Sequence, residues 1–477
     1  MNYKMVTYIL GWILIFEAIF MTVPIITAVI YNENALWYFL GTALICLIIG
    51  KLLTFKKRKN TTLYSRDGFV IVSMSWIVIS IFGALPMWLS GAIPSFVDAL
   101  FESVSGFTTT GASILSDVEA LPKSVLIWRS FSHWVGGMGV LVFIMAFLPL
   151  SGGHNMYLMK AESTGPSVSK IVPRVKTTAL ILYSIYFVLT LVQFILLLFG
   201  GMTIFQALNT SFSTAGTGGF GFLNTSMGSY SPYIQIVITV FMLLFSVNFS
   251  CYYLILIGKF KEAFNTEFKT FFLIVSSAIL IITINITPLF ENVWEALRHA
   301  GFTVSSLMSS TGFSTVDFDQ WPELSKSILV MVMFIGACAG STGGGIKVSR
   351  IIILFKGMAK ELETAIHPRE VKKIKLDSHI VDHETVRSVN VYMVAYMLVF
   401  AASVVAISFD NHGFTTNVTA VTATLNNIGP GLEMVGPTCN FGFFSVPSKL
   451  ILTFDMLVGR LELFPMLVLF KPSTWKR

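Results

Sequence analysis

Four segments of the sequence place glycine next to threonine, serine or asparagine, between apolar stretches long enough to cross a membrane. They are TTTGAS (108–113), TAGTGGF (214–220), SSTGFS (309–314) and NNIGPG (426–431). Glycine lets a backbone turn sharply and bring carbonyl oxygens toward a ligand, because it has no Cβ to exclude positive φ. A ring of such carbonyls can replace the hydration shell of a monovalent cation. Together the segments indicate cation-binding loops.

The same segments belong to an internal repeat, which predicts the elements that position them. Each follows a short amphipathic stretch and lies between two apolar runs, and the aligned glycines Gly111, Gly218, Gly312 and Gly429 lie 94 (312 − 218) to 117 (429 − 312) residues apart. Non-helical backbone at membrane depth is tolerated where it is buried in protein or lines a watery cavity. We therefore expect four loops to converge on one axis. For one copy alone, close helix packing is the alternative interpretation.

Composition assigns the chain to the integral membrane proteins. Of its 477 residues 54% are hydrophobic and only 12% are charged, against about 25% charged in soluble domains. Ten apolar runs approach or exceed the roughly 20 residues that a spanning helix needs. They are 5–30, 35–54, 68–90, 124–150, 177–200, 232–258, 270–290, 326–357, 389–409 and 448–470. We expect an all-α fold with an N-terminal pair of transmembrane helices and four pseudo-symmetric helix, re-entrant loop, helix units around one central pore. The predicted divisions are 1–60 for the pair, then 61–160, 161–262, 263–358 and 359–477 for the units, the last including a long connection.

The net charge of +7 is distributed asymmetrically. Basic residues collect in alternate connecting segments, and by the positive-inside rule these segments and both termini are cytoplasmic. This distribution argues against nucleic-acid binding. The opposite connections are acidic, and we interpret them as a solvated face, with concentration of cations as the alternative role. The acidic residues are Asp98, Glu102, Asp117, Glu119, Asp317, Asp319 and Glu323.

Three further motifs accompany the four glycine segments, namely WVGGMGV (134–140), GACAGSTGGGIK (336–347) and GRLELFPMLVLF (459–470). On these segments and motifs, the sequence resembles the Trk/Ktr/HKT superfamily of potassium transporters, most closely the TrkH type. The resemblance covers nearly the whole chain. It implies a single-chain, channel-like pore for potassium uptake across the bacterial inner membrane, with K⁺ as the transported ion and no organic cofactor. It also implies a homodimer in the lipid bilayer.

The resemblance further implies a potassium selectivity filter built from three residues of each loop. Ile428 and Pro430 depart from the pattern of the other loops, so we expect the fourth loop to be less regular. Of the filter residues, the first two in each loop are expected to contact K⁺. The filter residues are Thr110, Gly111 and Ala112; Thr217, Gly218 and Gly219; Thr311, Gly312 and Phe313; and Ile428, Gly429 and Pro430.

Five glycines between residues 336 and 345 interrupt one apolar run, and each costs a helix about 1 kcal/mol relative to alanine. We expect two half-helices joined by a loop, which the resemblance identifies as an intramembrane gate. A phosphate-binding loop is disfavoured because Ile346 separates Lys347 from the last glycine, and a packing kink is the other alternative. The predicted gate residues are Gly336, Gly340, Ser341, Thr342, Gly343, Gly344, Gly345 and Arg460.

Charged residues within the apolar runs are costly in a bilayer, so they should face protein or water. Arg460 lies midway along the last run, where it would oppose cation passage; an ion pair with Glu462 or Asp455 is the alternative. Arg129 and His133 suggest interfacial and packing roles more than a proton relay.

The polar stretch 356–388 is longer than a simple connection requires. The resemblance implies that a cytosolic nucleotide-binding subunit of the TrkA kind docks there, although an ordinary solvated connection is the alternative. Sequence alone does not separate channel-like flow from sodium- or proton-coupled symport. An enzyme is disfavoured because His133, His154 and the trio His367, His379 and His383 form no catalytic constellation.

Overall fold

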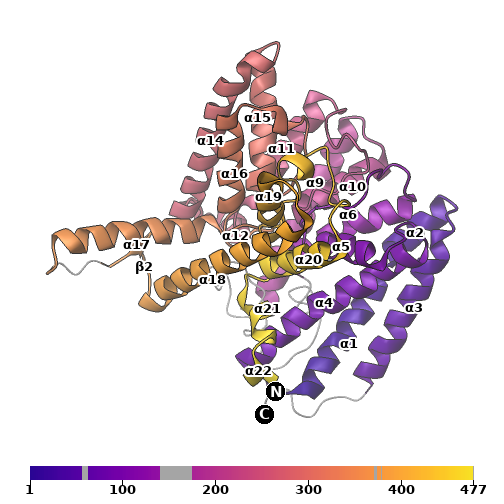
Figure 1. Ribbon diagram of the computed structural model, residues 1–477. Coiled ribbons are helices and arrows are strands. Elements are labelled where there is room, and N and C mark those ends of the chain that lie inside the picture. The colour runs from indigo at the N-terminus through magenta and orange to yellow at the C-terminus, as the bar shows by residue number, and fades with distance from the viewer. Residues whose placement is uncertain (56–62, 140–174, 370–372, 378, 476–477) are drawn as a thin grey trace.

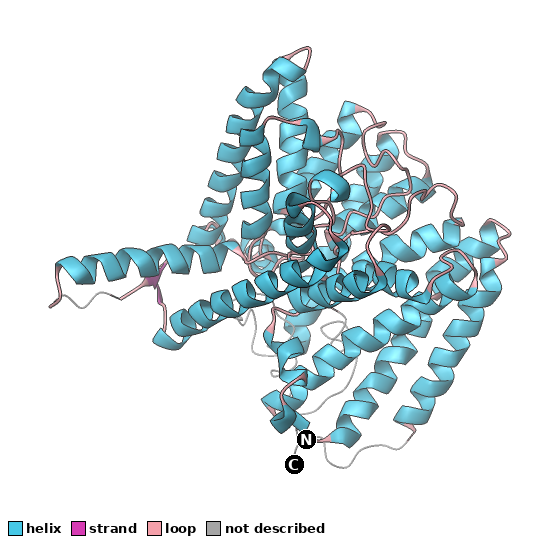
Figure 2. Cartoon of the chain, viewed as in Figure 1, coloured by secondary structure: helices cyan, strands magenta, loops and turns pink. Residues whose placement is uncertain are grey.

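The computed structural model describes residues 1–55, 63–139, 175–369, 373–377 and 379–475. In these ranges the elements are helices joined by loops, with one two-stranded antiparallel pair (Figures 1 and 2). An N-terminal group of helices precedes the repeat, and α1 packs along α3. Glycine allows this close approach, because a Cβ on Gly11 would lie 2.8 Å from the Leu53 Cβ of α3. The N-terminal helices are α1 (Tyr3–Phe20), α2 (Thr22–Ile30) and α3 (Ala35–Thr54).

Four units of similar design follow, each with a long helix, a short helix, a glycine-containing loop and a further helix. They are α4 (Ser65–Leu89), α5 (Phe96–Phe107) and α6 (Lys123–Gly137) in unit 1; α9 (Val175–Phe199), α10 (Ile204–Gly216), α11 (Pro232–Ser246) and α12 (Phe249–Leu256) in unit 2; α14 (Thr266–Ile286), α15 (Val293–Met308), α16 (Glu323–Ile335) and α17 (Val348–Ile366) in unit 3; and α18 (His383–Ile407), α19 (Phe414–Leu425), α20 (Val446–Arg460) and α21 (Phe464–Leu469) in unit 4.

Short elements connect and terminate these units. The strands pair as a hairpin between α17 and α18, with Lys375 opposite Ile380 and Leu376 opposite His379. The remaining elements are α13 (Phe260–Ala263), α22 (Pro472–Trp475), η1 (Thr287–Leu289), η2 (Phe318–Gln320), η3 (Ser408–Asp410), η4 (Glu433–Val435), β1 (Lys375–Leu376) and β2 (His379–Ile380).

Six helical segments are long and apolar enough to cross a membrane, and α11 with α12 forms a seventh that is bent by 90°, within the described ranges. Four of the ten predicted runs are therefore interrupted within the described residues, and the bent pair α11–α12 is one of them. The run 326–357 breaks between α16 and α17, and the run 448–470 breaks after Arg460, where Glu462 and Leu463 adopt positive φ. The run 124–150 begins as α6, and its second half lies outside the described residues, as does the predicted unit boundary near residue 160.

The spanning helices differ in how much of their surface is buried. In the most apolar stretch of α4, 61% of the residues are buried. In the most apolar stretch of the span that begins with α18, 22% of the residues are buried. Helices such as α18 therefore present apolar side chains outward, as a bilayer requires. Both termini lie together, because the Tyr3 hydroxyl donates to the Trp475 carbonyl at 2.7 Å (Figure 1).

Candidate functional site

The four glycine loops share one backbone conformation, directly after the short helices α5, α10, α15 and α19. In each loop a residue with φ between 54° and 58° is followed two positions later by a glycine with φ between 75° and 101°. Between them lies a residue whose N–H donates to the carbonyl five positions earlier, at 2.8 to 2.9 Å. The residues with positive φ are Thr109 and Gly111, Thr217 and Gly219, Ser310 and Gly312, and Asn427 and Gly429.

These loops meet in a closed ring, in which each glycine lies against a carbonyl oxygen of another loop. A Cβ on Gly111 would overlap the carbonyl of Gly218, one on Gly219 would overlap that of Thr311, and one on Gly312 would overlap that of Ile428. The ring closes at Gly429, whose Cβ would lie 3.0 Å from the Thr110 oxygen. Only glycine fits these positions, because they combine positive φ with backbone contact.

In the second loop, the structure shifts the alignment of the four central glycines by one residue. By conformation and by contact, Gly219 and not Gly218 is the counterpart of Gly111, Gly312 and Gly429. Gly218 takes the place of Thr110, and Thr217 takes that of Thr109. The shift arose because the sequence alignment paired Thr217 of TGG (217–219) with Thr110 of TTG (109–111).

A sequence signal for the correct register lies in the preceding helices. Ser213 and Ser306 each stand six residues before the central glycine, and their hydroxyls donate to the carbonyls of Phe220 and Phe313 at 2.8 and 2.6 Å. Serine 105 stands at the same spacing before Gly111. Hydroxyls on the short helices thus hold the loops in units 2 and 3.

The fourth loop keeps the hydrogen-bond pattern of the other three. Ile428 N–H donates to the Ala423 carbonyl at 2.8 Å, as its counterparts do, and Gly429 has the same sign of φ as the other glycines. Asn427 also joins this loop to the first, because its side-chain amide donates to the Thr110 hydroxyl at 2.8 Å. The loop still differs from the other three in degree, because Gly429 has a φ of 101°, against 75–82° for the other central glycines, and its Cβ would lie 3.0 Å from the neighbouring carbonyl oxygen.

A cavity of about 160 Å³ opens on the ring, and all four central glycines line it together with Ala112 and Pro430. Phe313, the remaining third-position residue of the predicted filter, is instead buried. The carbonyls of Thr110, Gly218, Thr311 and Ile428 form the seams between the loops. Uncharged backbone oxygens that converge in this way are suited to a dehydrated monovalent cation.

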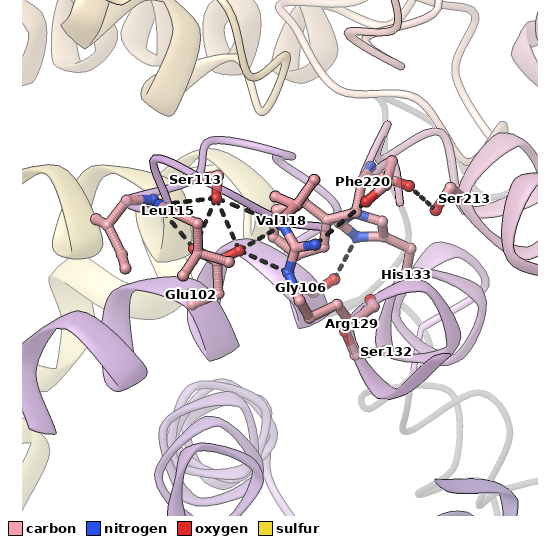
Figure 3. A network of polar contacts seen from close by, with 12 residues as sticks. Glu102, Gly106, Ser113, Leu115, Val118, Arg129, Ser132, His133, Ser213 and Phe220 are labelled. Atoms are coloured by element: carbon pink, nitrogen blue, oxygen red, sulfur yellow. Dashed lines mark hydrogen bonds and ion pairs between the residues drawn. The ribbon is translucent and has the colours of Figure 1, made fainter. Parts of the chain in front are cut away.

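A buried polar network supports the first two loops from behind (Figure 3). Glu102 and Arg129 are 1% and 2% exposed and form an ion pair at 2.7 Å. Glu102 also accepts from the N–H of Ile114 at 3.1 Å and from the Ser113 hydroxyl, just past Gly111. Arg129 donates to the Gly221 carbonyl at 3.2 Å, just past Gly219. The pair therefore connects loop 1 to loop 2.

His133 completes this network. Its Nδ1 lies 2.7 Å from the Gly106 carbonyl, and its Nε2 accepts from the Phe220 N–H at 3.3 Å. Its ring also fills the space beside Gly218, where any Cβ would overlap it. Arg129 and His133 are thus fully buried packing residues, and the expected interfacial location is wrong for both.

The acidic residues predicted as one solvated face divide into two groups. Glu102 is buried in the network above, and Asp98 pairs with Lys449 of α20 at 2.6 Å. Asp117 remains at the surface, where the Asn224 side chain donates to it at 2.9 Å and holds the pKa of its carboxyl below the ordinary value. Sequence position alone did not separate these roles, because α5 has a buried face and an exposed face.

The α16–α17 loop (residues 336–347) runs directly behind the glycine loops, and the prediction of two half-helices is confirmed. Its backbone reaches three units: Gly344 N–H donates to the Ser310 hydroxyl at 2.5 Å, Gly345 N–H to the Asn426 carbonyl at 3.1 Å, and Cys338 N–H to the Ser246 carbonyl at 3.1 Å. The glycines with positive φ are Gly336, Gly340 and Gly345. Buried gate candidates include Ser341, Thr342 and Gly343.

Arg460 connects the same loop to unit 1. Its guanidinium donates to the Thr342 carbonyl at 2.8 Å and to the carbonyls of Gly136 and Gly137 at 2.5 and 2.7 Å. Glu462 and Asp455, the predicted alternative ion-pair partners of Arg460, contact other residues. Glu462 pairs with Arg350, and Asp455 accepts a hydrogen bond from Ser403 at 2.7 Å. The α16–α17 loop thus contacts units 2, 3 and 4 directly, and Arg460 joins it to unit 1.

Four re-entrant loops around a carbonyl ring define this chain as a multi-pass membrane transport protein of pseudo-fourfold design. The family profile of the TrkH cation transport proteins matches residues 37–477. The chain belongs to this family, and the resemblance drawn from its motifs is confirmed.

Individual relatives match along their full lengths. The Trk system potassium uptake protein TrkH of Escherichia coli K12 is 37% identical over 484 residues and 100% of both chains, and TrkG of the same organism is 32% identical over 99% of both. The crystal structure of the potassium transporter TrkH from Vibrio parahaemolyticus matches with a TM-score of 0.90 at 34% identity, over 100% of both chains. These relatives are transport proteins, which confirms the prediction that the chain is not an enzyme; His154 lies outside the described residues.

Proposed function

We propose that this protein takes up potassium ions through a channel-like pore along the axis where the four glycine loops meet. The carbonyl ring is the observation that carries the proposal. Backbone oxygens from Thr110, Gly218, Thr311 and Ile428 offer a neutral, fixed set of ligands in place of water. Flow is driven by the membrane potential, which supplies about 2.3 kcal/mol per charge for each 100 mV. The names of the full-length relatives support potassium as the ion.

The α16–α17 loop acts as the gate of this pore. Its contacts with units 2, 3 and 4, and its link to unit 1 through Arg460, support a position across the axis, on the inner side of the glycine loops. Arg460 adds a positive charge at the same level, which opposes a cation electrostatically. Opening requires the loop to leave Asn426 and Ser310, and Arg460 to release Thr342.

We place the termini and the α17–α18 connection in the cytoplasm of a bacterial cell, with the protein in the inner membrane as a homodimer. The distribution of lysine and arginine supports this orientation. A cytosolic nucleotide-binding subunit docks on the projecting segment formed by α17 and the β1–β2 hairpin (Figure 1) and controls the gate. The projection of α17 away from the helical body supports docking there.

The test is uptake of radioactive rubidium into proteoliposomes under an imposed potential, with potassium or sodium as competitor. The native chain should be inhibited far better by potassium. Gly111→Ser and Gly219→Ser should lose this preference, because each adds a side chain at positive φ against a carbonyl of the next loop. Gly221→Ser is the matched control, since its Cβ would have ordinary contacts at 3.5 Å or more.

Equal inhibition of native uptake by sodium and potassium would overturn the proposal. Retained preference in Gly219→Ser, with loss in Gly221→Ser, would show that the ring is not the selective element. Addition of the regulatory subunit distinguishes a closed native gate from an absent pore.

A further inference from the structure

Glu267 lies in the first turn of α14 and contacts both the α16–α17 loop and the first turn of α17. Its Oε1 accepts from the Ala339 N–H at 2.8 Å and from the Ser349 N–H at 3.1 Å. Ala339 belongs to the first half of the loop, and Ser349 is the second residue of α17. One carboxylate oxygen therefore joins the loop to the start of the helix that follows it.

The contacts are strong for chemical reasons. Ser349 N–H is at a helix N-terminus, where backbone donors have no partner within the helix and a negative charge is favoured. Glu267 is only 7% exposed, so water competes little for its oxygens. Lys347 is 1% exposed, attracts Glu267 electrostatically and donates to the Gly343 carbonyl. The carboxylate thus stabilises the loop in the conformation that contacts units 2, 3 and 4 and Arg460.

The residue before Glu267 links this contact to the β1–β2 hairpin. Thr266 donates to Asp377 Oδ1 through both its N–H, at 2.7 Å, and its hydroxyl, at 2.6 Å. The hairpin is also held by α17, because the Lys356 ammonium donates to the Lys375 carbonyl at 2.7 Å. A displacement of the hairpin consequently pulls on the first turn of α14 and on α17 at once.

We infer that Glu267 is a positioning residue that holds the α16–α17 loop closed, and that Asp377, through Thr266, connects it to the surface hairpin. The inference rests on the proposed function of the loop as a gate. It assigns the regulation of that gate to a carboxylate more than 60 residues away in sequence from either half of the loop. A partner that moves the hairpin would weaken the two hydrogen bonds of Glu267 and release the loop.

The experiment compares initial rates of potential-driven rubidium uptake by full-length variants in proteoliposomes without a regulatory subunit. Glu267→Gln keeps the size of the side chain and one acceptor oxygen but loses the charge, and charge-assisted hydrogen bonds are about twice as strong as neutral ones. We expect uptake to rise about tenfold, which corresponds to about 1.4 kcal/mol of lost closed-state stability. The preference for potassium over sodium should stay native, because Glu267 does not touch the glycine loops.

Asp377→Asn is the second variant, at an exposed position where misfolding is not a concern. It should raise uptake about threefold, since it weakens the acceptor of both Thr266 hydrogen bonds. Glu361→Gln, an exposed carboxylate on α17, is the control for loss of one negative charge and should match the native rate. The Glu267→Gln, Asp377→Asn double variant should not exceed Glu267→Gln, because the two residues act in series.

Arg460→Ala separates failure of the inference from failure of the proposed function. If Arg460→Ala conducts but Glu267→Gln and Asp377→Asn stay at the native rate or below it, the positioning role is overturned and the pore stands. If no variant conducts, with or without the regulatory subunit, the transport proposal fails and the role of Glu267 with it. A rise that is accompanied by lost potassium preference would indicate damage to the ring and would also overturn the inference.

Discussion

Removing the charge of Glu102 tests whether the buried ion pair with Arg129 holds the first two glycine loops. In Glu102→Gln the Arg129 guanidinium, which is 2% exposed, loses the negative charge that lies 2.7 Å away in the native protein. Breaking a buried ion pair by removing one partner costs about 3–5 kcal/mol, because the remaining charge is left uncompensated. Ile114 and Ser113 can still donate to the amide oxygen, so the loss should come mainly from Arg129.

This loss is large relative to the stability of a folded protein, typically about 5–15 kcal/mol. We expect Glu102→Gln to unfold at clearly lower concentrations of a denaturing detergent than the native protein. The double variant Glu102→Gln, Arg129→Met removes both charges and should recover much of the stability, because an apolar replacement of a buried pair is often neutral. A double-mutant cycle of Glu102→Gln, Arg129→Met and the double variant should give an interaction energy of at least about 0.5 kcal/mol between the two side chains.

Rubidium uptake with sodium competition gives the functional readout. Glu102→Gln should lose potassium preference, since Ile114 and Gly221, the residues that the pair anchors, follow the central glycines of loops 1 and 2 closely. Native stability in Glu102→Gln would refute the reasoning. So would a double variant whose loss equals the sum of the two single losses.

Two further predictions concern packing and protonation. Gly136→Ala should lose about 1–3 kcal/mol of stability, because its Cβ would overlap the Phe107 carbonyl, whereas Gly301→Ala, with no atom within 4 Å of the new Cβ, should be neutral or gain up to about 1 kcal/mol in thermal unfolding. The low pKa of Asp117 gives a stabilising contribution that is present above the unfolded-state pKa and is lost as pH falls through the folded-state pKa. Asn224→Ala should raise this pKa toward its ordinary value, which an NMR titration of labelled aspartate would measure.

The repeat, the helical class and the broken run at 336–347 were predictable because each follows from local composition. Four glycine segments at similar separations require similar surroundings, and five glycines in ten residues cannot continue a helix in a stable way. The family followed from motifs spread along the chain. In these respects local sequence and final structure agree.

The rest depended on contacts between distant residues. Glu102 and Arg129 are 27 positions apart, and no periodicity indicates that they meet behind two loops. Loop 2 offers two adjacent glycines, and only their φ values and neighbours distinguish Gly219 at the ring from Gly218 beside His133. Glu267 is an ordinary helix-start residue by sequence, and its contact with Ala339 exists only in the folded chain.

The four positions that supply the ring carbonyls hold threonine, glycine, threonine and isoleucine, yet they share one backbone geometry. In a channel built from four identical subunits, one codon change alters every quarter of the ring together. Here one codon change alters a single quarter, so a mutation changes one of the four loops and leaves the other three as they were. Selection can therefore act on the ion contacts of each quadrant separately. A damaging change at Ile428 leaves the codons of the other three quadrants unchanged.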